Sequence, residues 1–132
     1  MREKRFISYE EYGNLVNKLS DLISHYSFNF NYIYGIERGG FPIAVHLSHH
    51  LNIPFLKPSE YFFTADNSKI LIVDDICDTG ATLKPFINRG FRTATIFYKQ
   101  RSVVEPLFFM EEVDKWIVFP WEREDEIPNR EE

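Results

Sequence analysis

Hydrophobic residues near the N-terminus recur at the spacing of an amphipathic helix. Residues 8–26 carry six of them at the i, i+3, i+4 and i+7 positions that share one helical face. They are Tyr12, Leu15, Val16, Leu19, Leu22 and Ile23. Ser8 and Glu11 have the spacing of a capping box, which satisfies free backbone N–H groups at the start of a helix. The pattern predicts a helix that begins after Ser8 and buries one face.

The rest of the chain alternates short apolar runs with helical patterns. The runs predict strands over residues 32–36, 52–56, 69–73, 92–99 and 113–120, and helices are predicted over 41–51 and 81–88. The run KILIV at 69–73 has no polar alternation, which is typical of a central parallel strand covered on both faces. This order of elements indicates an α/β fold, with a mostly parallel central sheet flanked by helices.

Length and composition fit one folded domain. The chain has 132 residues, and 44% of them are apolar, which is enough for a single buried core. We expect one domain over residues 1–122, followed by a charged C-terminal tail over 123–132.

Charge and cysteine content narrow the function classes. The net charge of −5 argues against nucleic acid or an anionic membrane as the partner, because both need a basic surface. The single cysteine, Cys77, cannot form an intramolecular disulfide, which favours a reducing compartment. No apolar run is long enough to span a membrane, and the N-terminal residues lack the apolar core of a signal peptide. We therefore expect a cytoplasmic protein with a small-molecule ligand.

The segment ILIVDDICDTGAT, residues 70–82, places acids directly after the most apolar strand. Ligands of parallel α/β sheets bind beyond the carboxyl ends of the strands, so Asp74 and Asp75 should face that crevice. As surface side chains, they should tolerate replacement by amides with little loss of stability. Carboxylates repel phosphate, so they should accept hydrogen bonds from ligand hydroxyls or hold magnesium. The small-residue turn that follows, with its backbone N–H groups at the start of a helix, suits a phosphate. A ribose 5-phosphate fits both features.

A second small-residue turn, GIERGG at 35–40, ends one strand and opens the next predicted helix. Gly39 and Gly40 allow a close backbone approach, and Arg38 offers a planar positive group suited to a second phosphate. Taken alone, this turn is as typical of an ordinary strand-to-helix connection as it is of a phosphate-binding loop. Two anion-binding turns on either side of an acid pair indicate a sugar phosphorylated at both ends.

The segment ILIVDDICDTGAT resembles the 5-phosphoribosyl-1-pyrophosphate (PRPP) signature of type I phosphoribosyltransferases. YIYGIERGGFPIAVHLSHHL is similar to the pyrophosphate loop and helix of that family. TATIFYK and DKWIVFPWE are similar to the base-binding end of the bacterial xanthine-guanine phosphoribosyltransferases. The resemblance implies an enzyme that transfers ribose 5-phosphate from PRPP to a 6-oxopurine, which gives a nucleoside monophosphate and pyrophosphate with Mg²⁺ as cofactor.

The resemblance also implies a role for each matching residue. Asp78 would accept the purine proton, and Asp74 and Asp75 would meet the ribose hydroxyls and the metal. The predicted PRPP-binding residues are Arg38, Gly39, Gly40, Asp74, Asp75, Asp78, Thr79, Gly80, Ala81 and Thr82. Lys99 would donate to the exocyclic purine oxygen, Trp116 would stack on the ring, and the Ile117 backbone would read position 2. The alternatives are surface exposure for Lys99 and core packing for Trp116.

The chain departs from the family pattern between residues 57 and 68, where family members carry a long mobile hood over the sugar. A short hood favours slow turnover or a different role, because closing lids exclude water from the reacting atoms. The alternative function is a non-catalytic PRPP- or nucleotide-binding regulatory module.

Aromatic residues predict a homodimer or a larger oligomer. EYFF at 60–63 and PLFFM at 106–110 should expose more apolar surface than a monomer of this size leaves in contact with water. Of the remaining reactive side chains, Cys77 has no adjacent base and is not expected to act as a nucleophile. The histidines of the second predicted helix, His46, His49 and His50, fit surface or packing roles.

Overall fold

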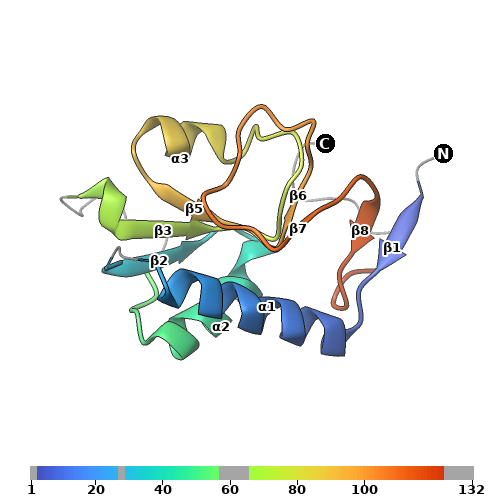
Figure 1. The fold of residues 1–132 in the computed structure, drawn as a ribbon, viewed down its shortest axis with the longest axis horizontal. Helices are drawn as coiled ribbons and strands as arrows, with labels where there is room; N and C mark the ends of the chain where they lie inside the picture. Colours follow the sequence, from blue (N-terminus) through green and yellow to red (C-terminus); the bar gives the residue numbers. More distant parts are fainter. Residues whose placement is uncertain (1–2, 27–28, 57–65, 124–132) are drawn as a thin grey trace.

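The computed structural model describes residues 3–26, 29–56 and 66–123, and it confirms an α/β fold with parallel strand pairing (Figure 1). One three-stranded sheet has the order β2-β3-β5, a second has the order β4-β6-β7, and β1 pairs with β8. The first half of the chain contains β1 (Lys4–Phe6), α1 (Tyr9–Ser24), β2 (Tyr32–Gly35), α2 (Gly40–Leu51) and the 3-10 helix η2 (Asn67–Lys69). The second half contains β3 (Ile70–Val73), β4 (Ile76–Cys77), α3 (Lys84–Asn88), β5 (Arg92–Ala94), β6 (Phe97–Tyr98), β7 (Glu111–Glu112) and β8 (Trp116–Val118).

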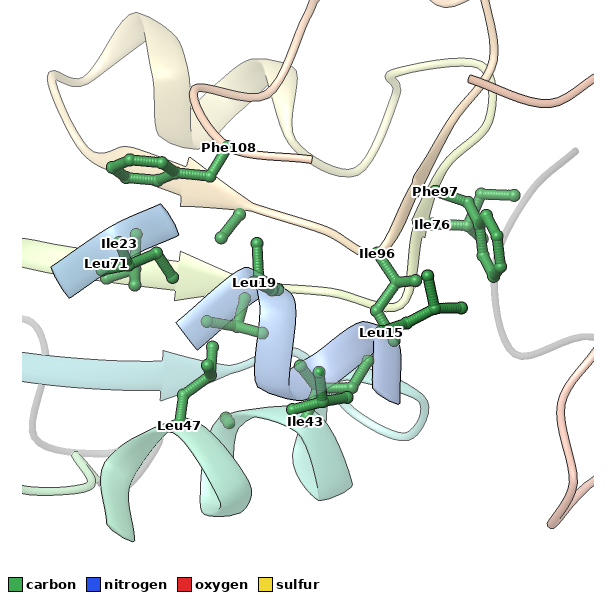
Figure 2. Packing of buried hydrophobic residues seen from close by; sticks show 14 of the residues in the cluster. Leu15, Leu19, Ile23, Ile43, Leu47, Leu71, Ile76, Ile96, Phe97 and Phe108 are labelled. Carbon is green, nitrogen blue, oxygen red and sulfur yellow. The ribbon is translucent and has the colours of Figure 1, made fainter. Parts of the chain in front are cut away.

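The central strand β3 is covered on both faces, as its apolar run predicts. All four of its residues are buried. Successive side chains of a strand point to opposite faces. Leu71 and Val73 accordingly pack in the cluster that contains α1 and α2, whereas Ile70 and Ile72 pack with residues on the α3 side. Helices α1 and α2 therefore cover one face, and α3 lies over the other (Figure 1). Figure 2 shows Leu71 beside Leu19 and Ile23 of α1.

Helix α1 begins where the capping pattern predicts. The Ser8 hydroxyl accepts a hydrogen bond from the Glu11 backbone N–H at 3.0 Å. The Glu11 carboxylate accepts a hydrogen bond from Arg5 Nη2 at 2.7 Å, so it fastens the helix to β1. No helix in the described part of the chain is long and apolar enough to cross a membrane.

The predicted strand 92–99 is wrong as a single element, because it divides into β5 and β6 in two different sheets. The division falls at Thr95, whose hydroxyl donates to the Phe97 carbonyl at 2.7 Å and bends the chain. Strand β3 gives way to β4 in the same manner, with Asp74 and Asp75 at the bend. The two neighbouring strands thus bend together, and the acids occupy the turning point.

Three other predicted elements are shorter than expected. Segment 52–56 contributes an isolated bridge between Ile33 and Phe55, and segment 113–120 forms only β8. The helix predicted over 81–88 shrinks to α3, a five-residue helix that has a proline in its first turn. Proline lacks an N–H group and fits the first turn of a helix, so it marks a start that the apolar pattern placed too early.

Part of the apolar surface expected at PLFFM is buried instead. Pro106 is buried and Phe108 is 3% exposed within the core, where its ring lies 4.9 Å from that of Tyr26. Phe109 packs at 4.9 Å on Tyr98, and Leu107 remains exposed. The sequence EYFF lies outside the described residues, as do residues 124–132 of the predicted tail. The homo-oligomer therefore stays a prediction, and PLFFM exposes less apolar surface in support of it than the sequence indicates.

Candidate functional site

Asp74 and Asp75 lie at the carboxyl end of β3, where the strand bends away from its sheet. The Asp74 N–H donates to the Ala94 carbonyl at 3.1 Å, and the Asp75 carbonyl accepts from the Ile96 N–H at 3.2 Å. These backbone bonds hold the acids against the parallel bend between β5 and β6. The acid pair is therefore positioned by two strands rather than by a free loop.

Both acidic side chains are buried, which corrects the expectation that they lie at the surface. Asp74 is 4% exposed and Asp75 is fully buried. Asp74 Oδ1 accepts a hydrogen bond from the Asp75 N–H at 2.9 Å, and Asp75 Oδ1 accepts one from the Ile76 N–H at 2.8 Å. Buried polar groups need such partners, and an amide oxygen could keep the same bonds. We therefore expect the fold to tolerate asparagine at both positions because an amide oxygen can keep these acceptor bonds, and not because the side chains are exposed.

The glycine-containing turn at 35–40 lies directly against the acid pair. A Cβ on Gly39 would overlap the Asp75 carboxylate, and a Cβ on Gly40 would overlap the Val73 carbonyl oxygen and lie 3.0 Å from Asp74 Cα. Glycine is required here because the backbone approaches so closely. The structure therefore places the turn at 35–40 against the acid pair, two features that the sequence marks separately.

Glu37 and Arg38 stand on the outer side of this turn, and both are exposed. The peptide bond that joins them is cis. Arg38 is thus an exposed residue of the turn whose Gly39 backbone lies against the Asp75 carboxylate.

The turn at 78–82 is closed by its own backbone and by a segment further along the chain. Gly80 adopts a φ of 88°, which favours glycine, and a Cβ there would lie 2.5 Å from the Ser102 hydroxyl. The Ala81 N–H donates to the Thr79 hydroxyl at 3.2 Å. Helix α3 begins only at Lys84, so N–H groups of the turn, rather than the end of a long helix, would hold a phosphate.

Asp78 is 4% exposed and faces two cations. Lys99 Nζ lies 3.3 Å from Asp78 Oδ1, and it is itself buried, with 4% exposure. Arg101 donates to the same oxygen from Nε at 2.9 Å and from Nη2 at 2.6 Å. The structure thus joins Lys99 to Asp78 and contradicts surface exposure of this lysine. Arg101 was not among the expected site residues, because nothing in its local sequence marks it.

A cavity of about 180 Å³ adjoins these cations. Its lining consists of Lys99, Gln100, Arg101, Val113 and Asp114. Pockets for drug-sized ligands usually measure about 300–1,000 Å³, so this one suits a single ring system rather than a whole nucleotide.

Strand β8 holds the other two residues expected to contact a base. The Trp116 N–H donates to the Glu3 carbonyl at 2.9 Å, and the Val118 carbonyl accepts from the Ile7 N–H at 2.9 Å. Because alternate residues of a parallel strand bond to the same neighbour, the Ile117 backbone groups point away from β1. The Ile117 side chain is buried in the core, and Trp116 is half-buried outside the cavity lining. The structure does not bring the Trp116 ring into that cavity.

Cys77 lies between the acids in a packed position. Its thiol contacts the Ser102 hydroxyl at 3.2 Å, and burial raises its pKa above the ordinary value. A raised pKa keeps the thiol protonated near neutral pH, where the thiolate would be the nucleophile. The buried thiol thus fits a packing role.

Fold and site together define a class of protein: a parallel α/β domain that presents buried carboxylates between two glycine-containing turns, which suits a phosphorylated ligand bearing hydroxyls. Residues 60–127 match the family model described as the phosphoribosyl transferase domain, and the chain belongs to this family. Its fold is that of a type I phosphoribosyltransferase.

Solved structures of other proteins share this fold. A purine phosphoribosyltransferase from Pyrococcus horikoshii OT3 is 27% identical with a TM-score of 0.79, and the alignment covers 98% of this chain and 99% of that one. The xanthine-guanine-hypoxanthine phosphoribosyltransferase of Helicobacter pylori is 21% identical with a TM-score of 0.77, over 92% and 93% of the two chains. A hypothetical protein from Neisseria gonorrhoeae with bound ppGpp is 19% identical with a TM-score of 0.75, over 95% and 92%.

Proposed function

We propose that this protein is a PRPP-dependent purine phosphoribosyltransferase that acts on a 6-oxopurine. The observation that carries the proposal is the buried pair Asp74 and Asp75, set between the turns at 35–40 and 78–82. Membership of the phosphoribosyl transferase domain family and the likeness to the Pyrococcus enzyme support it.

In this proposal the ligand lies across the acid pair. The 5-phosphate occupies the turn of Asp78, Thr79, Gly80, Ala81 and Thr82, and the ribose hydroxyls donate to the carboxylates. The pyrophosphate faces Gly39, Gly40 and the positive Arg38. The 5-phosphate thus faces backbone N–H donors, and the pyrophosphate faces a positive side chain.

The Asp78 and Lys99 pair favours a 6-oxopurine over a 6-aminopurine. The Lys99 ammonium has only donors, and Asp78 as a carboxylate only accepts. The exocyclic oxygen and N7 are neighbours on one edge of the purine, which matches a donor and an acceptor 3.3 Å apart. An amino group at position 6 would place a donor against the Lys99 donor. Trp116 is proposed to stack on the ring, and the outward-facing Ile117 backbone is proposed to read position 2.

The reaction forms one bond and breaks another at C1 of the ribose. The purine N9 supplies the electron pair for the new N9–C1 bond while the C1–oxygen bond breaks, and that bonding pair leaves with pyrophosphate. Asp78 accepts the proton that the purine releases from N7. Charge develops at C1 and on the leaving group, and the fixed carboxylates and Arg38 stabilise it.

Asp74 and Asp75 also fit a magnesium ion. Two carboxylates are a typical protein share of a Mg²⁺ site, because the ion keeps several waters and substrate phosphates as its other ligands. Within the described residues, no group of three or more His, Cys, Asp or Glu side chains could hold a metal. When bound, magnesium would neutralise charge on the pyrophosphate.

A non-catalytic nucleotide-binding module is the second candidate. The Neisseria structure favours it, because that protein was solved with ppGpp. Residues 57–65 of the short hood predicted over 57–68 lie outside the described residues, so the hood does not separate the two candidates.

A turnover assay distinguishes the two functions. The purified protein is incubated with PRPP, Mg²⁺ and, in turn, guanine, xanthine, hypoxanthine and adenine, and nucleotide and pyrophosphate are measured. We expect equal amounts of both products with at least one 6-oxopurine and little with adenine. A protein that binds PRPP but forms no product would favour the regulatory module.

A further inference from the structure

Arg101 holds the acid that is proposed to take the purine proton. Its guanidinium places two donors on one oxygen, Oδ1 of Asp78, at 2.9 and 2.6 Å. Two bonds from one rigid planar group fix an acceptor more tightly than a single flexible ammonium does. The Asp78 carboxylate is buried, whereas 46% of the Arg101 side chain is exposed. Arg101 therefore reaches the acid from the solvent side.

The segment that carries Arg101 is fastened to the phosphate turn. The Lys99 N–H donates to the Cys77 carbonyl at 2.9 Å, and the Val103 N–H donates to the Thr79 carbonyl at 2.9 Å. Between these points the Ser102 N–H donates to the Lys99 carbonyl at 2.9 Å and closes a tight turn. Arg101 lies within that turn, so its backbone is held in place before any ligand arrives.

Lys99 and Arg101 share the same carboxylate oxygen but differ in their proposed tasks. The purine oxygen would draw the Lys99 ammonium toward the base. That movement would take one cation away from the buried Asp78 carboxylate, and the loss of a partner is costly for a buried charge. Arg101 is placed to remain on Oδ1 during that exchange.

We infer that Arg101 is a positioning residue that acts through Asp78, orienting this carboxylate toward N7 of the bound base. The inference rests on the proposed function. Arg101 contributes no reacting group, and its removal lowers the affinity of the site for bases that carry a proton on N7.

Two base analogues isolate this effect. 9-Deazahypoxanthine carries N7–H and has carbon at the ribosylated position, so it binds without reacting, whereas 7-deazahypoxanthine has carbon at position 7 and offers Asp78 no such donor. Both retain the exocyclic oxygen for Lys99 and have no substituent at position 2. Binding of each analogue to the full chain is measured by calorimetry with PRPP and Mg²⁺ present.

We expect Arg101→Gln to weaken 9-deazahypoxanthine binding by about tenfold, or about 1.4 kcal/mol, because Asp78 would no longer be held in place to accept the N7–H bond. Binding of 7-deazahypoxanthine should change less than about twofold. Arg101→Lys should restore part of the loss, because it returns the charge without the paired donors. Arg89→Gln removes the same charge from an exposed position at the end of α3 and should leave both affinities unchanged.

The outcomes separate two failures. Equal weakening of both analogues by Arg101→Gln would mean that Arg101 contributes only as part of the cavity lining, and it would overturn the action through Asp78. No change in either affinity would overturn that action as well. Failure of the unaltered protein to bind either analogue beside PRPP would overturn the proposed purine function itself, and the role of Arg101 with it.

Discussion

The acid turn and the base-side segment of this protein are built in different ways. The acid turn, residues 74–82, follows the buried strand β3, and the carboxylates of Asp74 and Asp75 bond to backbone N–H groups one residue away. The base-side segment, residues 99–118, depends on contacts far along the chain, such as the pairing of Arg101 with Asp78 and of β8 with β1. Local construction makes the first region readable from sequence, and distant contacts make the second one hard to foresee.

The two regions nevertheless meet at one residue. Asp78 belongs to the acid turn, and two of its partners, Lys99 and Arg101, belong to the base-side segment. A change to the acid turn should therefore affect both ligands, whereas a change in β8 should affect only the base.

The largest effect is expected from Gly40→Ala. The new Cβ would overlap a backbone carbonyl of β3, which cannot turn aside, and overpacking of this kind costs up to about 3 kcal/mol. Gly13→Ala in α1 is the matched control. No atom lies within 4 Å of the Cβ added there, so it should stabilise the helix by about 0.5–1 kcal/mol. Urea unfolding of both variants measures these changes. Equal stability of the two would mean that the acid turn is not held by close backbone contact.

Trp116→Ala should separate the base side from the sugar side. Loss of a stacking partner should weaken purine binding by about 1–3 kcal/mol and leave PRPP affinity nearly unchanged. The control is Trp121→Ala, because Trp121 stacks on Phe119 at 5.1 Å and contacts Tyr12 edge-on at 4.9 Å. That variant should lose stability rather than base affinity. Calorimetry and thermal unfolding distinguish the two results, and a Trp116 variant that merely unfolds would assign this residue to the core.

The smallest effect is expected at His46 of α2, which belongs neither to the acid turn nor to the base-side segment. Burial, followed by the charges of His50 and His49, lowers the pKa of His46 below its ordinary value of 6.5. The folded state favours neutral His46, so this contribution is complete above pH 6.5 and is lost as pH falls through the folded pKa. When the pH falls from 7.5 to 5, the free energy of unfolding should decrease more in the unaltered protein than in the His46→Gln variant. Urea titrations at each pH test this, and parallel curves would contradict it.

The same contrast explains what could be predicted from the sequence. The cap at Ser8, the buried strand β3 and the closeness of the acids to the strand end follow from spacing and apolar pattern, and all are confirmed. The division of 92–99 at Thr95 could not be foreseen, because the apolar pattern continues through the bend. Burial of Asp74 and Asp75 depends on the approach of the turn at 35–40, and the position of Arg101 depends on a turn that closes over residues 77–79.

PRPP binding to the acid pair tests the central claim most directly. Calorimetry with Mg²⁺ compares the unaltered protein, Asp74→Asn with Asp75→Asn, and Asp21→Asn on the exposed face of α1 as control. The double variant keeps acceptor oxygens for the backbone bonds, so it should remain folded and yet lose PRPP binding, whereas the control should bind as before. Unchanged PRPP affinity in a folded double variant would contradict the assignment of the acid pair.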